Sequence, residues 1–189
     1  MNIIVTGAAK GIGFEVVKVL AKHKQNHIVA ISRNGRALKD LVSECLPHIR
    51  EEFPWDVEAK LVGLNPPLIL DIREPGEFDA MHISDSLNVP RGILESACEY
   101  GYEETVRELV EARSRDIVVV CRSGNRSTLA AFTMQRMGYR QVVSMKTGLR
   151  GWNDYELPLV NAKGMTVPVE LADDFFTTRL RPDQVDPER

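Results

Sequence analysis

Short apolar runs alternate with amphipathic segments along most of the chain, and this alternation restricts the fold more than any other feature. The runs typical of buried strands lie at residues 3–5, 27–32, 68–72, 87–89, 117–120 and 141–145. Parallel strands need a long crossover between them, which is usually a helix. The pattern therefore predicts an α/β fold, with a parallel sheet that helices cover on both faces.

The segments between these runs predict the helices. A stripe of apolar residues at helical spacing covers residues 38–46, and Pro47 should end that helix because proline has no amide hydrogen to donate. We expect further helices from Asp56 to Leu61, over 102–110 and over 127–137. Beyond Val160 the pattern weakens, and we expect only an edge strand at 165–169 and a frayed tail from Arg181.

Composition narrows the classes of function. The 189 residues carry 24 Lys and Arg against 27 Asp and Glu, a formal net charge of −3, which is unlike the basic surface of a nucleic-acid-binding protein. No apolar run approaches the length of a membrane span. The three cysteines are odd in number and have no metal-like spacing, so we expect a reducing, cytoplasmic setting and no metal site.

The segment from Cys121 to Ser127 carries the sharpest chemical signal. A cysteine follows the most hydrophobic strand, then a loop with Gly124, then the start of a helix. Ligand sites in parallel sheets lie at the carboxyl ends of strands, and loop amides with a helix N-terminus favour bound anions. Together with Arg122 and Arg126, these groups should stabilise a thiolate, which makes Cys121 a candidate nucleophile.

Loop length separates two kinds of cysteine chemistry. Cysteine phosphatases place five residues between the cysteine and the arginine, whereas four separate Cys121 from Arg126. A tighter ring of amides suits a single sulfur atom on Cys121 better than a tetrahedral oxyanion. The spacing therefore favours persulfide chemistry over phosphoryl chemistry.

At these residues the chain resembles the rhodanese family of sulfurtransferases. The resemblance runs from roughly residue 59 to 160. Its motifs, in order, are 70–78 (LDIREPGEF), His82-Ile83, 87–90 (LNVP), 121–127 (CRSGNRS) and 147–152 (TGLRGW). Met81 and Thr147 depart from the family pattern, which usually has glycine at both positions.

The resemblance implies sulfur transfer in two steps. Cys121 would take the sulfane sulfur of a thiosulfate-like donor as a persulfide, and a thiol or cyanide would then accept it. The residues expected to bind the substrate are Arg122, Ser123, Gly124, Asn125, Arg126 and Ser127. Arg122 and Arg126 would orient the anionic donor, and Ser123 and Ser127 would donate hydroxyl hydrogen bonds to the sulfur.

Several other polar residues are interpreted as structural. We expect Asp71 and Arg73 to form an ion pair and His82 to be a hydrogen-bonded framework residue. Trp152 should be a packing anchor. Cys45 should lie in a core, and Cys98 is left without a role, with a resolving thiol as the alternative.

The N-terminal segment carries a second resemblance, to short-chain dehydrogenases and reductases. Residues 6–13 (TGAAKGIG) are similar to that family's cofactor loop, which implies a nucleotide-binding turn at Gly7, Gly11, Ile12 and Gly13. Arg33 stands where an arginine would suit the 2′-phosphate of NADP. No tyrosine is followed by lysine four residues later, so the family's catalytic pair is absent and a working dehydrogenase is not expected.

These resemblances predict a Rossmann-like β-α-β fragment at 1–44, a rhodanese-like domain at 45–160 and a C-terminal extension at 161–189. A β-α-β fragment cannot bury its own faces, so we expect it to extend an edge of the rhodanese-like sheet. The joined signatures suggest a natural or engineered chimera. Three hypotheses follow: a sulfurtransferase without a required cofactor, an NADP-binding module, or an inactive chimeric scaffold. The oligomeric state is left open.

Overall fold

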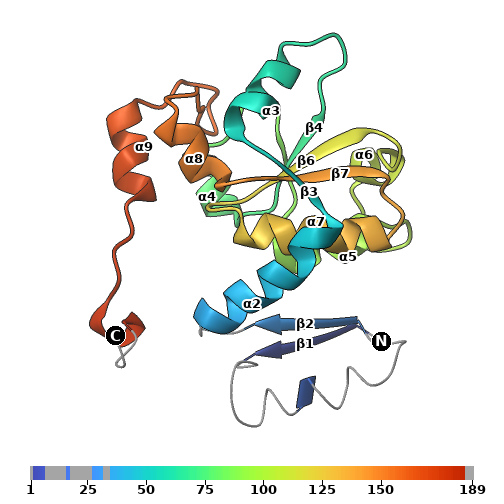
Figure 1. The fold of residues 1–189 in the computed structure, drawn as a ribbon. Coiled ribbons are helices and arrows are strands. Elements are labelled where there is room, and N and C mark those ends of the chain that lie inside the picture. The colour runs from blue at the N-terminus through green and yellow to red at the C-terminus, as the bar shows by residue number, and fades with distance from the viewer. Residues whose placement is uncertain (1, 7–15, 18–26, 32–34, 186–189) are drawn as a thin grey trace. The chain divides into compact units, whose positions relative to one another are not determined.

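The computed structural model describes residues 2–6, 16–17, 27–31 and 35–185 (Figure 1). The chain divides into two compact units, Met1–Pro47 and His48–Arg189. In the first unit, β1 (Asn2–Thr6) pairs in parallel with β2 (His27–Ile31), and α2 (Gly35–Cys45) follows. The parallel pairing and the helix that ends before Pro47 agree with the sequence-based predictions.

The second unit contains a five-stranded sheet, and every pair of neighbouring strands in it is parallel. The order is β3-β7-β6-β4-β5. The strands are β3 (Arg50–Glu52), β4 (Leu68–Asp71), β5 (Leu87–Asn88), β6 (Asp116–Val120) and β7 (Gln141–Met145). Because β6 lies at the centre, the loop that follows it leaves the middle of the sheet's carboxyl edge.

Helices lie between these strands and after the last of them. They are α3 (Pro54–Leu61), α4 (Pro75–Ala80), α5 (Leu94–Ala97), α6 (Arg107–Glu111), α7 (Asn125–Arg136), α8 (Gly148–Asp154) and α9 (Val169–Phe176). Short 3-10 turns lie at Leu46–His48, Arg91–Ile93 and Pro182–Gln184. Among the described residues, no helix combines the length and apolar character that a membrane crossing requires.

Alternate residues of the central strands face two separate hydrophobic cores. Leu70 and Val119 point to the core that α5, α6 and α7 cover, whereas Ile69 and Val118 point to the core beneath α3, α8 and α9. Figure 1 shows α5 and α7 on one side of the sheet and α3 and α8 on the other. Strands buried on both faces explain why these runs are apolar throughout rather than alternating.

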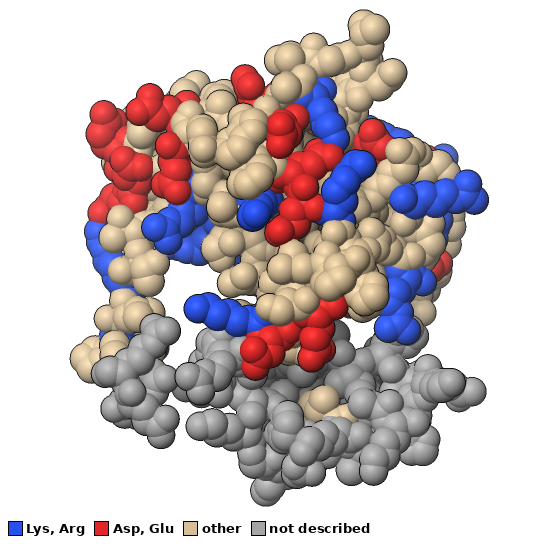
Figure 2. All heavy atoms as spheres, viewed as in Figure 1, with Lys and Arg blue, Asp and Glu red and all other residues tan. Residues whose placement is uncertain are grey.

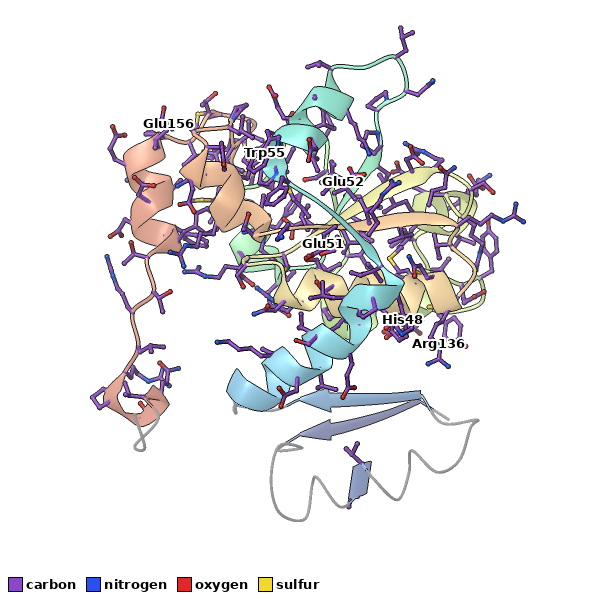
Figure 3. The ribbon with its side chains drawn as sticks, viewed as in Figure 1. His48, Glu51, Glu52, Trp55, Arg136 and Glu156 are labelled. Atoms are coloured by element: carbon purple, nitrogen blue, oxygen red, sulfur yellow. The ribbon has the colours of Figure 1, made fainter. Side chains whose placement is uncertain are left out.

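The expectation that the N-terminal strands would extend the rhodanese-like sheet is wrong. β1 and β2 form a two-stranded sheet of their own, and the edge beside β7 belongs to β3. β3 was not predicted because it consists of charged residues. Glu52, labelled in Figure 3, is nevertheless mostly buried, and its carboxylate pairs with Lys60 of α3 and with Arg50.

Other element boundaries also differ from the expectations. Pro54 opens α3 as its first residue, and Asp56 accepts the Phe53 amide from inside the helix rather than preceding it. The helix predicted from residue 102 begins only at Arg107. Residues 165–169 form no strand, because Thr166 makes one isolated bridge and Val169 starts α9.

Asp71 and Arg73 form the expected ion pair, and both side chains are fully buried. The Asp71 carboxylate accepts the Arg73 amide at 3.0 Å, Nε at 3.0 Å and Nη2 at 2.6 Å. Nη2 also donates to the Met81 carbonyl at 2.6 Å, while Nη1 is buried without a partner among the described residues. The pair ties the end of β4 to the turn after α4.

Gly148 lets α8 pack directly against the loop after β6. A Cβ at this glycine would collide with the Cys121 carbonyl oxygen and lie 2.7 Å from the Ser123 nitrogen, and the glycine has a φ of +61°. The close approach allows the next two amides of α8 to donate to the loop: Leu149 to the Cys121 carbonyl at 2.8 Å and Arg150 to the Arg122 carbonyl at 3.0 Å.

Replacing one partner of the buried pair should be costly. Asp71→Asn leaves an uncompensated guanidinium in the interior and should lower the free energy of unfolding by about 3 kcal/mol or more. Urea denaturation followed by tryptophan fluorescence, to which the buried Trp152 contributes, measures this loss. Glu111→Gln, in an exposed pair with Arg107, is the control and should leave the stability unchanged. Equal stabilities of the two variants would contradict the prediction.

Gly148→Ala should be destabilising for two reasons, its positive φ and its contact with the loop. Gly164 has a φ of +70° but nothing within 4 Å, so Gly164→Ala isolates the cost of the backbone conformation. That cost should be about 1 kcal/mol, and Gly148→Ala should exceed it by at least a similar amount. Thermal unfolding of both variants measures the difference. If the Gly148→Ala protein is as stable as the Gly164→Ala protein, the close contact between Gly148 and the loop after β6 does not limit the size of the residue at this position.

Candidate active site

Cys121 lies directly after the central strand β6, at the carboxyl edge of the sheet. The residue is only 1% exposed, and its side chain belongs to the core beneath α7. Its position is the one predicted from the sequence. The burial is greater than the sequence indicated, so only a small or narrow group can reach the sulfur.

Two backbone amides point at the sulfur. The Gly124 amide donates to Sγ at 3.2 Å and the Ser127 amide at 3.3 Å. Gly124 makes this possible with a φ of +91°, which turns the chain into α7 at Asn125. The Ser127 amide belongs to the first turn of that helix, where amides have no partner within the helix. Both donors therefore favour a negative charge at Sγ.

Buried hydroxyls support the loop from behind. Ser127 Oγ donates to the Gly124 carbonyl at 2.9 Å, and Thr128 Oγ1 donates to the same oxygen at 3.0 Å. Ser144 of β7 donates to Ser127 Oγ at 2.9 Å. Because the Ser127 hydroxyl proton is used in this way, Ser127 Oγ accepts from the Cys121 thiol at 3.5 Å rather than donating to it. The Ser127 hydroxyl therefore does not donate to the sulfur in this structure, contrary to the expectation.

Sequence reasoning missed Ser144 and Thr128. Ser144 could have been found because it is a single polar residue within the apolar run of β7. A serine in a buried strand needs a hydrogen-bond partner. Ser144 is fully buried, and its hydroxyl oxygen lies 3.5 Å from the hydroxyl oxygen of Thr128 in α7. Their contacts fix the start of α7 in place.

Arg126 lies beside the loop in an ion pair with Glu77 of α4. Its two terminal nitrogens donate to the two carboxylate oxygens at 3.1 and 3.2 Å. Burial alone would raise the pKa of Glu77, but the hydrogen bonds and charge of Arg126 outweigh this effect, and the pKa of that carboxyl lies below its usual value. Glu77 is thus an anion at neutral pH, and Arg126 enters the site already paired.

The side chain of Arg122 is bonded to the end of α9. Its guanidinium donates to the carbonyl oxygens of Phe175 at 3.1 Å and Phe176 at 2.9 Å, at the end of α9. It also lies over both phenyl rings, with centroid distances of 5.7 and 5.5 Å. The expectation that Arg122 orients an anionic donor is therefore not met in this arrangement, because the C-terminal carbonyls of a helix attract the cation.

Within the described part of the protein, the side chains of Ser123 and Asn125 take no part in holding the loop. Ser123 is exposed and Asn125 half-buried, and neither side chain hydrogen-bonds to another described residue. They are available at the surface of the loop.

The residues interpreted as structural occupy structural positions. His82 Nδ1 lies 2.8 Å from the Phe78 carbonyl, and its ring stacks on that of Phe78 at 3.8 Å. Trp152 is buried and donates from Nε1 to the Pro158 carbonyl at 3.0 Å. Both contacts agree with the roles expected from the sequence.

The other two cysteines lack the features of Cys121. Cys98 is completely buried, and burial raises the pKa of its thiol, which opposes a role as a resolving thiolate. Cys45 was expected to be a core residue, but it is only half-buried. Burial raises the pKa of its thiol, and the charge of Glu44 adds a smaller effect in the same direction.

The predicted nucleotide-binding residues cannot be placed. Gly7, Gly11, Ile12, Gly13 and Arg33 lie outside the residues that the structure describes. The described ranges contain no group of three or more His, Cys, Asp or Glu side chains that could hold a metal ion.

Two family models match the chain. The model of the rhodanese-like domain matches residues 56–155, and that of the short chain dehydrogenases matches residues 1–59. A sulfurtransferase of Allochromatium vinosum is 30% identical over 108 residues, which are 57% of this chain and 92% of that protein. A Bacillus subtilis protein named as a sulfur carrier is 34% identical over 84 residues, 44% of this chain and only 40% of that protein.

Solved structures agree in fold. A Rhodopseudomonas palustris protein of unknown function, described as a possible tyrosine phosphatase, superposes with a TM-score of 0.58 at 29% identity, over 66% of this chain and 94% of that chain. The polysulfide-sulfur transferase of Wolinella succinogenes gives a TM-score of 0.51 at 24% identity, over 67% and 88%.

The parallel sheet, the loop around Cys121 and the match over more than half of the sequence lead to one conclusion: this chain belongs to the rhodanese-like domain family.

Proposed function

We propose that the chain is a sulfurtransferase that carries a sulfane sulfur on Cys121. The observation that carries the proposal is the pair of amides, from Gly124 and Ser127, directed at Sγ. A persulfide places its negative charge one atom beyond Sγ, at the mouth of the same loop. Family membership and the named sulfurtransferase relative support the general reaction.

The first step transfers sulfur from a thiosulfate-like donor. The Cys121 thiolate attacks the outer sulfur of thiosulfate, the sulfur–sulfur bond of the donor breaks, and sulfite leaves with the electron pair. In the second step, cyanide or a thiolate attacks the outer sulfur of the persulfide. Thiocyanate or a new persulfide then leaves, and the Cys121 thiolate is restored. Each step is a displacement at sulfur and needs no external oxidant.

The burial of Cys121 supports a narrow sulfur donor. At 1% exposure the thiol is accessible only to a terminal atom, such as the outer sulfur of thiosulfate or a persulfide. A phosphate ester would need a wider ring of amides, and the loop has one residue fewer than that of the cysteine phosphatases. We therefore favour sulfur transfer over the phosphatase activity suggested for the Rhodopseudomonas protein.

A second candidate concerns the first unit. The short chain dehydrogenase match to residues 1–59 and the parallel β1–β2 pair favour a nucleotide-binding fragment, with NADP as the candidate ligand. Titration with NADPH tests it, since binding would shift the nicotinamide fluorescence and a flat response would remove this candidate.

We propose a cytoplasmic setting for both activities, because a reducing compartment keeps the three free cysteines reduced.

Loading with excess thiosulfate should add one sulfur atom, about 32 Da, to the intact protein, and cyanide should remove it as thiocyanate. Cys121→Ser should abolish both signals, because the hydroxyl is not a nucleophile of this kind. Cys45→Ser and Cys98→Ser are the matched controls and should still acquire the adduct. A wild-type protein that gains no mass, or a Cys121→Ser variant that does, would contradict the proposal.

A further inference from the structure

We propose that Glu77 determines which sulfur donors the loop accepts. By holding Arg126, Glu77 makes the site prefer donors of lower negative charge, the persulfides of small thiols, over the doubly charged thiosulfate. This inference rests on the proposed sulfurtransferase function and adds to it the class of the preferred donor.

The two loop arginines are both engaged by other groups of the protein. Arg122 donates to the carbonyl oxygens that end α9. Arg126 is the remaining loop guanidinium, and both of its terminal nitrogens bond to Glu77. The buried pair of Asp71 and Arg73 adds no net charge. Arg122 keeps its positive charge, since its partners are neutral carbonyls, but these bonds hold its guanidinium at the end of α9, whereas Glu77 offsets the charge of Arg126.

Glu77 holds Arg126 in a strong pair. The two side chains meet through two parallel hydrogen bonds, the bidentate geometry that suits a guanidinium and a carboxylate. They are 37% and 25% exposed, so water screens the pair less than it screens a fully exposed one. A thiosulfate ion that recruits Arg126 has to displace Glu77 or tolerate its negative charge nearby.

The surface beyond Arg122 adds to this effect. In the view of Figure 2, acidic side chains gather over α8 and α9. The exposed acidic residues of these helices and of the turn between them are Asp154, Glu156, Glu170, Asp173 and Asp174. The helix that holds Arg122 is therefore itself acidic, and its carboxylates oppose the approach of a dianion from that side.

A persulfide donor avoids this electrostatic cost. The Cys121 thiolate attacks the terminal sulfur of R–S–SH, the donor's sulfur–sulfur bond breaks, and R–S⁻ leaves while Cys121 becomes the persulfide. The attacking group and the leaving group each carry one negative charge, so the reaction does not bring a second anionic charge into the loop. A thin terminal sulfur also fits the narrow access to a buried thiol.

The test compares two donors in the same protein. The rate constants kcat/KM for thiosulfate and for the persulfide of 2-mercaptoethanol are measured with cyanide as acceptor. Glu77→Gln frees Arg126 and should raise the ratio of thiosulfate to persulfide kcat/KM about tenfold. Glu77→Ala, a second neutral variant, should change the ratio in the same direction. Glu77→Asp keeps the charge and should retain the wild-type ratio within about twofold.

The matched control is Glu99→Gln. Glu99 pairs with Arg113 at 2.7 Å with side-chain exposures of 47% and 32%, and Arg113 precedes β6, whereas Cys121 follows it. This variant should keep the wild-type ratio. An unchanged or lower ratio in Glu77→Gln, including a parallel fall with both donors, would overturn the role of Glu77. Failure of both donors to load wild-type Cys121 would instead refute the proposed function.

Discussion

The site depends on one interaction, the donation of two loop amides to the sulfur of Cys121. An amide can face the sulfur only if the carbonyls of the same loop find partners elsewhere. The amides of Leu149 and Arg150 in α8 supply two of these partners, and the hydroxyls of Ser127 and Thr128 bind a third carbonyl. The loop is thus held from outside by α8 and from behind by α7 and β7, and the anion-binding side is left to the sulfur.

The sequence was sufficient to predict the elements that place Cys121. β4, β6 and β7 are buried on both faces, so their residues are mostly apolar, and the glycine and arginines after β6 marked the loop. β3 was not predictable in the same way. Its three residues are all charged, and it is a strand because β7 offers an unpaired edge rather than because of its own composition.

The direction of the two loop arginines was also beyond sequence reasoning. Arg122 binds carbonyls more than fifty residues later, and only the packing of α9 against α8 brings them into reach. Arg126 finds Glu77, which lay within a quoted motif but had no assigned role. A cation near a nucleophile invites the interpretation that it binds substrate, yet each of these cations satisfies a charge or dipole of the fold itself.

The amide shifts of Gly124 and Ser127 in ¹H–¹⁵N spectra test the central claim most directly. Formation of the Cys121 persulfide should shift the amide protons of both residues, because the negative charge moves from Sγ to the outer sulfur and the strength of their hydrogen bonds changes with it. Amides at the opposite end of the sheet, such as that of Gln141, should not move. Sulfur loading that leaves the Gly124 and Ser127 signals in place would contradict the account, since these amides would then have no part in holding the sulfur.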